Sequence, residues 1–118
     1  MRKTISKCFT FEAAHFLNHS NNIKNKNIHG HSFHVEVFIS GVIGKDGFII
    51  DFSKLEKDIH KIKEKLDHNF LNDIDGLGTP TLENIGIWLW SLFIKKHSNL
   101  SQIVIKRKSC GESFTISK

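Results

Sequence analysis

Apolar and polar positions alternate along the first part of the chain, which is the pattern of a β-strand with one buried face. The alternation runs over residues 4–16, and its apolar side carries Phe9, Phe11, Ala13 and His15. A polar, asparagine-rich segment, LNHSNNIKNKNI at 17–28, predicts a loop. Alternation resumes over 31–42, and its apolar side carries Phe33, Val35 and Val37. The pattern therefore predicts two strands joined by a polar loop.

The spacing of apolar residues changes to three and four after this region, which predicts helices. Ser53 and Glu56 have the spacing of a capping box at a helix start. The apolar stripe of this helix is Phe52, Leu55, Ile59, Ile62 and Leu66. Pro80 is expected at the first position of a second helix, behind Thr79 as its cap. The apolar stripe of the second helix is Leu82, Ile85, Trp88, Leu89, Leu92 and Phe93.

The remaining segments complete an α+β layer structure. GKDG at 44–47 predicts a hairpin turn leading into FIIDF, and QIVIKRK and SFTIS predict two closing strands around a CGE turn. Strands, two helices and strands in that order predict an antiparallel four-stranded sheet with both helices on one face. A chain of 118 residues without repeat or linker is expected to form a single domain, residues 1–118.

Composition and charge narrow the class of protein. A hydrophobic fraction of 39% and a charged fraction of 25% are typical of globular proteins in water. The net charge of +5 comes from scattered lysines without a nucleic-acid-binding motif, so it favours small anionic ligands over nucleic acid as partners. The longest apolar run, at 85–94, is too short for a membrane span. No apolar leader precedes Cys8, and neither it nor Cys110 forms a CxxC pair, which predicts a cytoplasmic location with reduced thiols.

Two closely spaced histidines provide the first candidate chemistry. His29 and His31 in HGHSF share one side of a strand, about 6 to 7 Å apart, and Gly30 removes a side chain that would resist a bend. His15 lies on the buried side of the first strand and joins them if the two strands are neighbours. Three imidazoles with one open position are typical of a catalytic zinc site. The alternative is that His29 and His31 are loop histidines without a partner.

A second cluster, LDHNFLND at 66–73, follows the end of the first predicted helix. In it Asp67 can orient the imidazole of His68 and raise its basicity, which suits proton transfer. The alternative is a helix-capping histidine beside a solvated carboxylate.

Five segments in chain order resemble the 6-pyruvoyl-tetrahydropterin synthase and 6-carboxytetrahydropterin synthase family: FTFEAAHFL, HGHSF, GFIIDFSKLE, LDHNFLND and PTLEN. This short form is most similar to the bacterial 6-carboxytetrahydropterin synthases of the queuosine-precursor pathway. The resemblance implies the T-fold, a ββααββ unit that assembles into a homohexamer of two trimers. It also implies Zn²⁺ on His15, His29 and His31, with a catalytic Asp67–His68 pair from a neighbouring subunit.

The resemblance further implies a reaction. The substrate would be 7,8-dihydroneopterin triphosphate, and zinc would acidify its side-chain hydroxyls while a base and an acid move protons and triphosphate leaves. The carboxy-forming branch also releases acetaldehyde. Thr81 matches a substrate-contacting helix start, with simple helix capping as the alternative. Lys24 and Lys26 suit the triphosphate.

Two positions depart from the family pattern. Asn25 stands where the family has a catalytic cysteine, and an amide cannot take a proton near neutral pH. Arg107 stands where the family has a pterin-anchoring glutamate, and a guanidinium only donates hydrogen bonds. Glu112 can replace that glutamate if the strand contains a bulge.

The departures leave three interpretations open. The chain is a working 6-carboxytetrahydropterin synthase with His68 or a metal-bound hydroxide as base, or a zinc lyase or aldolase of the same fold on another substrate, or a non-catalytic zinc-binding member. The Asp67–His68 pair favours an enzyme, whereas Arg107 favours a substrate with a carboxylate or phosphate. Cys110, in the turn beyond Arg107, is a further candidate base or nucleophile.

Overall fold

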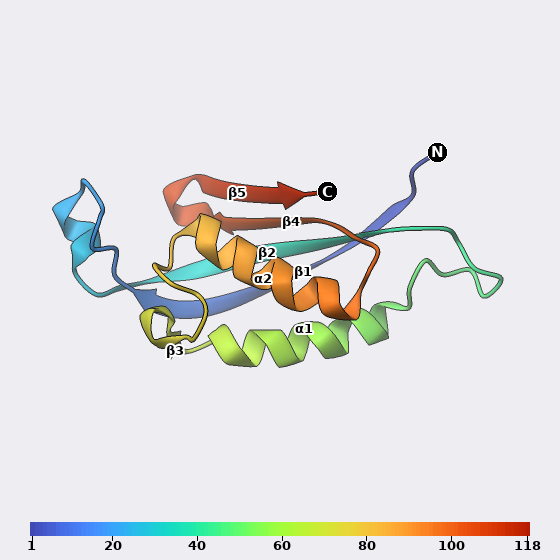
Figure 1. Ribbon diagram of the computed structural model, residues 1–118, viewed down its shortest axis with the longest axis horizontal. Helices are drawn as coiled ribbons and strands as arrows, with labels where there is room; N and C mark the ends of the chain where they lie inside the picture. Colours follow the sequence, from blue (N-terminus) through green and yellow to red (C-terminus); the bar gives the residue numbers. More distant parts are fainter.

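A long hairpin of two antiparallel strands forms the centre of the protein, which a computed structural model describes over residues 1–118 (Figure 1). β1 spans Thr4–His15 and β2 spans His29–Ser40. Their register is unbroken from Thr4 opposite Ser40 to His15 opposite His29. The two predicted strands therefore pair along their full length, and two histidines meet at one end.

The sheet has five strands in the order β3-β1-β2-β4-β5. β4, Leu100–Arg107, is antiparallel to β2, and β5, Glu112–Ser117, is antiparallel to β4. β3, Asn69–Phe70, runs parallel to β1 beside Ala13 and Ala14. The predicted four antiparallel strands are present, but the prediction missed β3 because two residues are too few to show any periodicity.

Two helices cover one face of this sheet (Figure 1). α1 spans Phe52–Leu66 and α2 spans Leu82–Lys96. Their buried residues recur at spacings of three and four: Leu55, Ile59, Ile62 and Leu66 in α1, and Leu82, Ile85, Gly86, Leu89 and Phe93 in α2. Trp88 and Leu92, which were predicted to be in the buried stripe, are only partly buried at its margin.

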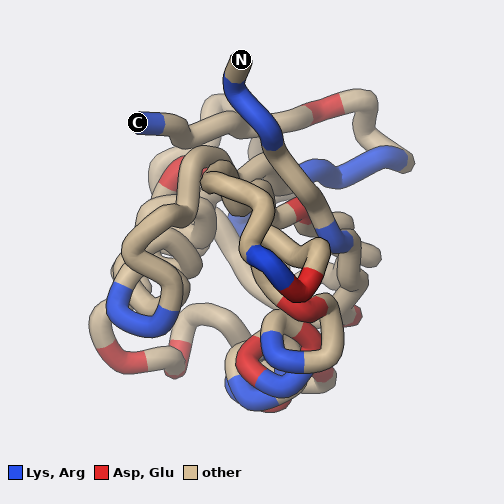
Figure 2. The backbone as a smooth tube through the Cα atoms, turned by 90° about the vertical axis from the view of Figure 1, so that its right-hand side faces the viewer, with Lys and Arg blue, Asp and Glu red and all other residues tan.

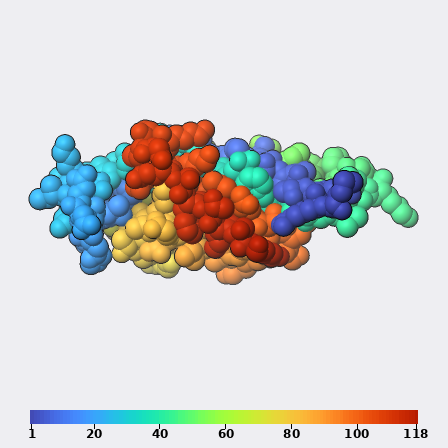
Figure 3. Space-filling view, turned by 90° about the horizontal axis from the view of Figure 1, so that it is seen from above, coloured from blue at the N-terminus to red at the C-terminus, as the bar shows by residue number.

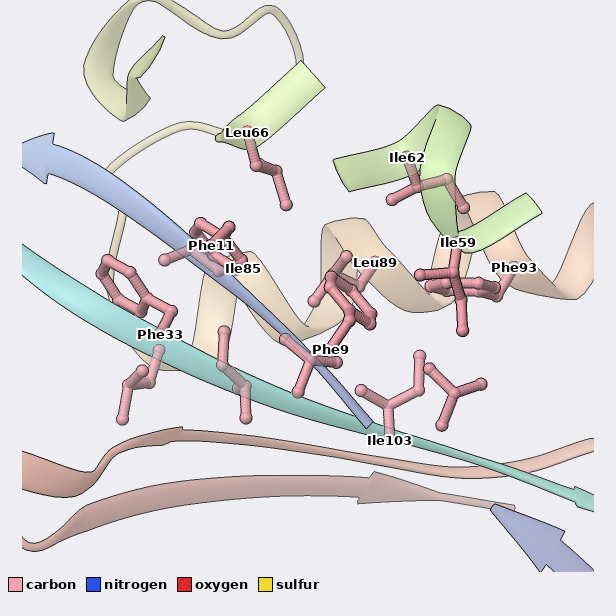
Figure 4. Close-up of a cluster of buried hydrophobic side chains, with 14 of the residues drawn as sticks. Phe9, Phe11, Phe33, Ile59, Ile62, Leu66, Ile85, Leu89, Phe93 and Ile103 are labelled. Carbon is pink, nitrogen blue, oxygen red and sulfur yellow. The ribbon is translucent and has the colours of Figure 1, made fainter. Parts of the chain in front are cut away.

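A continuous cluster of 20 buried residues fills the space between the sheet and the helices (Figure 4). Phe11 and Phe33 stack across the β1–β2 hairpin with ring centroids 4.8 Å apart. Phe33 also meets the ring of His15 edge-on, with centroids 5.8 Å apart. The core therefore extends to the histidine end of the hairpin, where Phe33 packs against the ring of His15.

The starts of both helices differ slightly from the prediction. Asp51, not Ser53, caps α1, because its carboxylate accepts the backbone N–H of Ser53 at 2.9 Å. Thr81, not Thr79, caps α2, because its hydroxyl accepts the backbone N–H of Asn84 at 3.1 Å. Asp51 and Thr81 are the residues whose backbone is extended just before the helix, and this geometry decides which side chain can cap.

The connection between β2 and α1 contains the predicted turn but no strand. The N–H of Gly44 donates to the carbonyl of Phe48 at 2.8 Å, which closes the turn. Ile49 and Ile50 in FIIDF instead pack against the core as part of the loop. The prediction of a hairpin turn leading into FIIDF was therefore wrong, because no strand follows the turn.

The molecule is elongated, with extents of 54 × 26 × 23 Å (Figure 3). The polar loop at 17–28 lies at one end and the loop at 41–51 lies at the other. The histidine end of the hairpin is therefore next to the first loop. None of the helices has the length and apolar character that crossing a bilayer requires.

Gly86 provides a test of the packing between α2 and β5. A Cβ atom at this position would lie 2.6 Å from Cδ2 of Phe114. We expect Gly86→Ala to lower the free energy of unfolding by about 1–3 kcal/mol through overpacking, although alanine favours helices. Urea denaturation followed by circular dichroism measures this, with Ser91→Ala on the exposed side of α2 as the control. A variant as stable as the parent would contradict the tight contact.

Candidate active site

Three histidines meet at the end of the β1–β2 hairpin. His15 pairs with His29, and His31 pairs with Ala13, so all three rings project toward the helix side of the sheet. One ring nitrogen from each lies within 4.8 Å of the other two. His15 is fully buried and the other two are half-buried. The structure thus brings together the three residues that the sequence analysis proposed as metal ligands.

Backbone carbonyl groups orient two of these imidazoles. Nδ1 of His15 lies 2.9 Å from the carbonyl oxygen of Pro80, and Nδ1 of His29 lies 2.7 Å from that of Asn27. A carbonyl oxygen only accepts, so each Nδ1 carries the proton and donates it. In a neutral imidazole this leaves the Nε2 lone pair free, which is the form that binds a metal ion.

The free ring nitrogens converge without a hydrogen-bond donor between them. Nε2 of His15 and Nε2 of His29 are 3.1 Å apart, and Nε2 of His31 is buried without a partner. Two lone pairs that face each other repel, whereas a cation between them satisfies both. Two nitrogens at a zinc–nitrogen distance from a tetrahedral ion are about 3.4 Å apart, close to the observed separation. The residues therefore fit a divalent ion held by three imidazoles.

Burial keeps the imidazoles of His15 and His31 neutral. It is the main cause that lowers the pKa of His15 from 6.5 to about 4, and positive charge at His29, His31 and Arg107 lowers it further against the opposing effect of the Pro80 carbonyl. The pKa of His31 is also lowered, chiefly by burial and then by Arg107 and His29. Near neutral pH, protons therefore do not compete with a metal ion for these two rings.

The end of the β4–β5 hairpin closes the site beside His31. Arg107 and Glu112 are opposite each other in a regular ladder, and Nη2 of Arg107 is 2.7 Å from Oε1 of Glu112. The register of β4 shifts at Ser101, far from Arg107, and no bulge is needed near Arg107, because Glu112 reaches it from the neighbouring strand. Arg107 lowers and Glu112 raises the pKa of His31, so both charges act on the histidine cluster.

Cys110 also reaches the cluster, from the short 3₁₀ turn Lys108–Cys110 between β4 and β5. Its Sγ lies 4.0 Å from Nδ1 of His31. The amide of Asn25, in contrast, donates to the hydroxyl of Ser20 at 3.0 Å within its own loop. The thiol near the histidines of this chain therefore comes from the β4–β5 turn and not from the position of Asn25.

The segment before α2 contributes through its backbone. The carbonyl of Pro80 holds His15, while the hydroxyl of the next residue, Thr81, accepts the N–H of Asn84 as a helix cap. This hydrogen bond is that of a helix cap, which was the alternative to a substrate contact for Thr81. Sequence analysis missed the roles of Pro80 and Asn27, because every residue carries a backbone carbonyl and no residue type reveals which one will orient a histidine.

Asp67 and His68 form a hydrogen-bonded pair at the edge of β1. Nδ1 of His68 donates to Oδ2 of Asp67 at 2.9 Å, and Oδ1 of Asp67 accepts the N–H of Glu12 at 2.8 Å. The Glu12 N–H is the larger cause, and the His68 bond the second, of a lowered pKa at Asp67. His68 has a φ of 58°, an unusual value for a residue with a side chain. The ring is thus oriented with its Nε2 free.

His68 lies outside the group of converging ring nitrogens that the three histidines of its own chain form. It lines a surface hollow of about 610 Å³ together with Glu12, Ala14, Gly30 and Ser32, and His31 also borders this hollow. Successive side chains of a strand point to opposite faces, so Glu12, Ala14 and Ser32 face away from the helices. The hollow beside the Asp67–His68 pair is therefore lined mainly from the face of the sheet away from the helices.

The metal-free protein should lose stability as the pH falls. Unfolded His15 takes up a proton near pH 6.5, whereas folded His15 resists protonation down to about 4. The unfolded state binds more protons in this window, so the free energy of unfolding should decrease by at most about 3 kcal/mol as pH drops through it. Urea denaturation with a chelator, at several pH values, measures the slope. His15→Phe should reduce the slope of the free energy of unfolding against pH, whereas His19→Gln, in the exposed loop, should leave it unchanged. Equal slopes for the two variants would show that His15 is not the cause.

Comparison with known proteins places this geometry in a family. The chain matches the 6-pyruvoyl tetrahydropterin synthase family over residues 4–117. It is 40% identical over 93 residues to the 6-carboxy-5,6,7,8-tetrahydropterin synthase of Synechocystis, covering 74% of this chain and 71% of that protein. It is also 44% identical over 62 residues to the dihydroneopterin monophosphate aldolase of Pyrococcus furiosus, covering 52% of each.

The fold agrees with this assignment. The structure of the 6-pyruvoyl tetrahydropterin synthase of Caenorhabditis elegans superimposes with a TM-score of 0.85 at 26% identity, covering 100% of this chain and 96% of that one. The two helices on a five-stranded sheet are the predicted T-fold. On sequence and structure together, the chain belongs to the 6-pyruvoyl tetrahydropterin synthase family.

Proposed function

We propose that this chain is a zinc-dependent lyase that converts 7,8-dihydroneopterin triphosphate to 6-carboxy-5,6,7,8-tetrahydropterin, with loss of acetaldehyde and triphosphate, in the synthesis of a queuosine precursor. The family and the Synechocystis relative support a pterin-metabolising enzyme of the lyase kind. The observation that carries the proposal is the convergence of one ring nitrogen from each of three histidines within 4.8 Å, with no donor between Nε2 of His15 and Nε2 of His29. Both cysteines are free, in keeping with the cytoplasmic location that the proposal includes.

In this proposal His15, His29 and His31 hold the zinc ion. Three neutral nitrogen donors without a carboxylate suit zinc better than magnesium or calcium, which prefer oxygen. A zinc ion with three protein ligands keeps one position open and acidifies a hydroxyl group bound there. The carbonyls of Pro80 and Asn27 keep two of the rings in the orientation that this requires.

Proton transfer is assigned to His68, supplied by a second copy of the chain. Because His68 lies outside the cluster of its own chain, the pair is assigned to the cluster of another copy, across a contact between copies. Asp67 orients the ring and stabilises its protonated form. The outer edges of β5 and of β1 over residues 4–11 are not paired with another strand, so copies can join edge to edge. A homohexamer of two trimers is part of the proposal.

Substrate binding is assigned to Arg107, Glu112 and Thr81. The carboxylate of Glu112, held by Arg107, supplies an acceptor for the N–H groups of a pterin. Nε of Arg107 is buried without a partner and supplies a donor in the same place. A donor next to an acceptor matches the mixed edge of an amino-pyrimidine ring. The net charge of +5, to which Lys24 and Lys26 in the loop before His29 contribute, attracts the triphosphate.

A second candidate is a zinc-dependent lyase or aldolase that acts on a different pterin or on a non-pterin substrate. Arg107 favours it, since a half-buried guanidinium also suits a substrate carboxylate or phosphate. The similarity to an enzyme named as an aldolase supports it as well. A catalytically inactive zinc-binding protein is the weakest candidate, because a structural ion has no use for the oriented Asp67–His68 pair.

The reaction itself is the first test. The zinc-loaded protein with 7,8-dihydroneopterin triphosphate should release acetaldehyde and form 6-carboxytetrahydropterin. His68→Ala should lower kcat by about 10² to 10⁴, whereas His60→Ala, at an exposed histidine of α1, should not. Absence of both turnover and pterin binding in a fluorescence titration would exclude the synthase and leave the second candidate. Pterin binding without turnover would place the defect in proton transfer.

Metal content is the second test, and it has a matched control on the same strand. Purified protein should hold one zinc ion per chain by atomic absorption, and His31→Ala should lose most of it because three-point ligation is broken. His34→Ala removes a histidine three residues along β2 on the other face and should retain zinc. A parent protein that takes up no zinc after reconstitution would contradict all three candidates.

A further inference from the structure

A groove between α1 and α2 combines an apolar floor with a cationic rim. It has a volume of about 390 Å³ and is lined by Asp58, Lys61, Ile62 and Lys65 of α1 and by Leu92, Lys95 and Lys96 of α2. Ile62 and Leu92 form the floor, and the four lysines are exposed around it. None of these residues belongs to the candidate active site, so the groove is a separate feature of the surface.

The four lysines of this rim form no ion pair within the chain. None of the four ion pairs in the structure includes a lysine. Asp58 is the one carboxylate on the lining, and its Oδ2 is already held by Nε2 of His97 at 2.8 Å. Lys and Arg occur on both helices in a view along the molecule (Figure 2). An anionic partner would therefore meet four ammonium groups without intramolecular competition.

The walls of the groove are held in place. His97, whose side chain is 1% exposed, caps the C-terminus of α2 and bonds to Asp58 of α1, which ties the two helices together. Ile62 belongs to the buried core, and Leu92 packs against it. The groove is thus formed before any partner binds, which lowers the entropy cost of association.

We propose that this groove binds an acidic amphipathic helix of a partner protein. Its α1 wall runs from Asp58 to Lys65, about 10 Å or two helical turns. Such a partner would set two apolar side chains, one turn apart, on Ile62 and Leu92. Carboxylates on either side of that stripe would face the lysines of α1 and of α2. This is the helix-in-groove mode of recognition with charge added on both flanks.

Charge and shape together select this occupant. A second copy that presented the same groove would bring matching lysines instead of carboxylates, so this groove is not suited to a contact between copies such as the edge strands offer. A nucleic acid would pair its phosphates with the lysines but leave the apolar floor in water. An amphiphile with a single anionic head pairs with one or two of the four lysines. A helix with an apolar stripe between two rows of carboxylates satisfies both the floor and the rim.

Fluorescence anisotropy with synthetic peptides tests the proposal. The probe is a labelled, end-blocked helical peptide of about twelve residues with leucines one turn apart and glutamates on both flanks. It should bind saturably, and its affinity should fall as salt is raised. A peptide of the same composition with its leucines moved to opposite faces should bind about tenfold more weakly. Equal binding of the two peptides would overturn the proposal, because the floor would then play no part.

Variants locate the binding on the protein. Lys61→Glu with Lys65→Glu should weaken the peptide about tenfold or more. Lys3→Glu with Lys45→Glu makes the same change in net charge outside the groove and should have little effect. Leu92→Ser keeps the charge and should also weaken binding. Equal losses from both lysine pairs, or tighter binding of phosphatidylserine vesicles or RNA than of the peptide by the parent protein, would overturn the proposal.

Discussion

The antiparallel register between β1 and β2 is the constraint on which the rest of this structure depends. It sets Phe11 opposite Phe33 and His15 opposite His29 along one continuous ladder. A shift of one residue would turn every side chain of one strand to the other face, which would expose the aromatic stack and separate the histidines. The pairing that buries the aromatic rings is therefore the same pairing that assembles the histidine cluster.

Burial gives this cluster its chemical character. Burial in the core lowers the pKa of His15, and backbone carbonyls accept hydrogen bonds from the Nδ1–H groups of His15 and His29. What remains is a set of lone pairs directed at one point, an arrangement that is unfavourable without a cation and favourable with one. The fold thus prepares a metal site at some cost to the stability of the metal-free protein.

The chain also keeps two groups of functional side chains apart. The histidine cluster, Arg107 and Glu112 lie together at one end, while Asp67 and His68 lie outside this cluster and line a hollow formed mainly by the face away from the helices. A single chain therefore presents a ligand cluster and a hydrogen-bonded Asp–His pair that is not part of it. Under the proposed assembly, each copy would complete the site of another, and catalysis would depend on the contact between copies.

The sequence by itself determined the main strands, both helices and the shared face of His15, His29 and His31, because periodicity along a chain records which side of each element is buried. Only the tertiary structure decided that Glu112 reaches Arg107 across a ladder and that two backbone carbonyls orient the histidines. It also decided that His68 lies outside the histidine cluster. These contacts join segments distant in sequence, often through backbone groups common to every residue, so no local pattern of residue types encodes them.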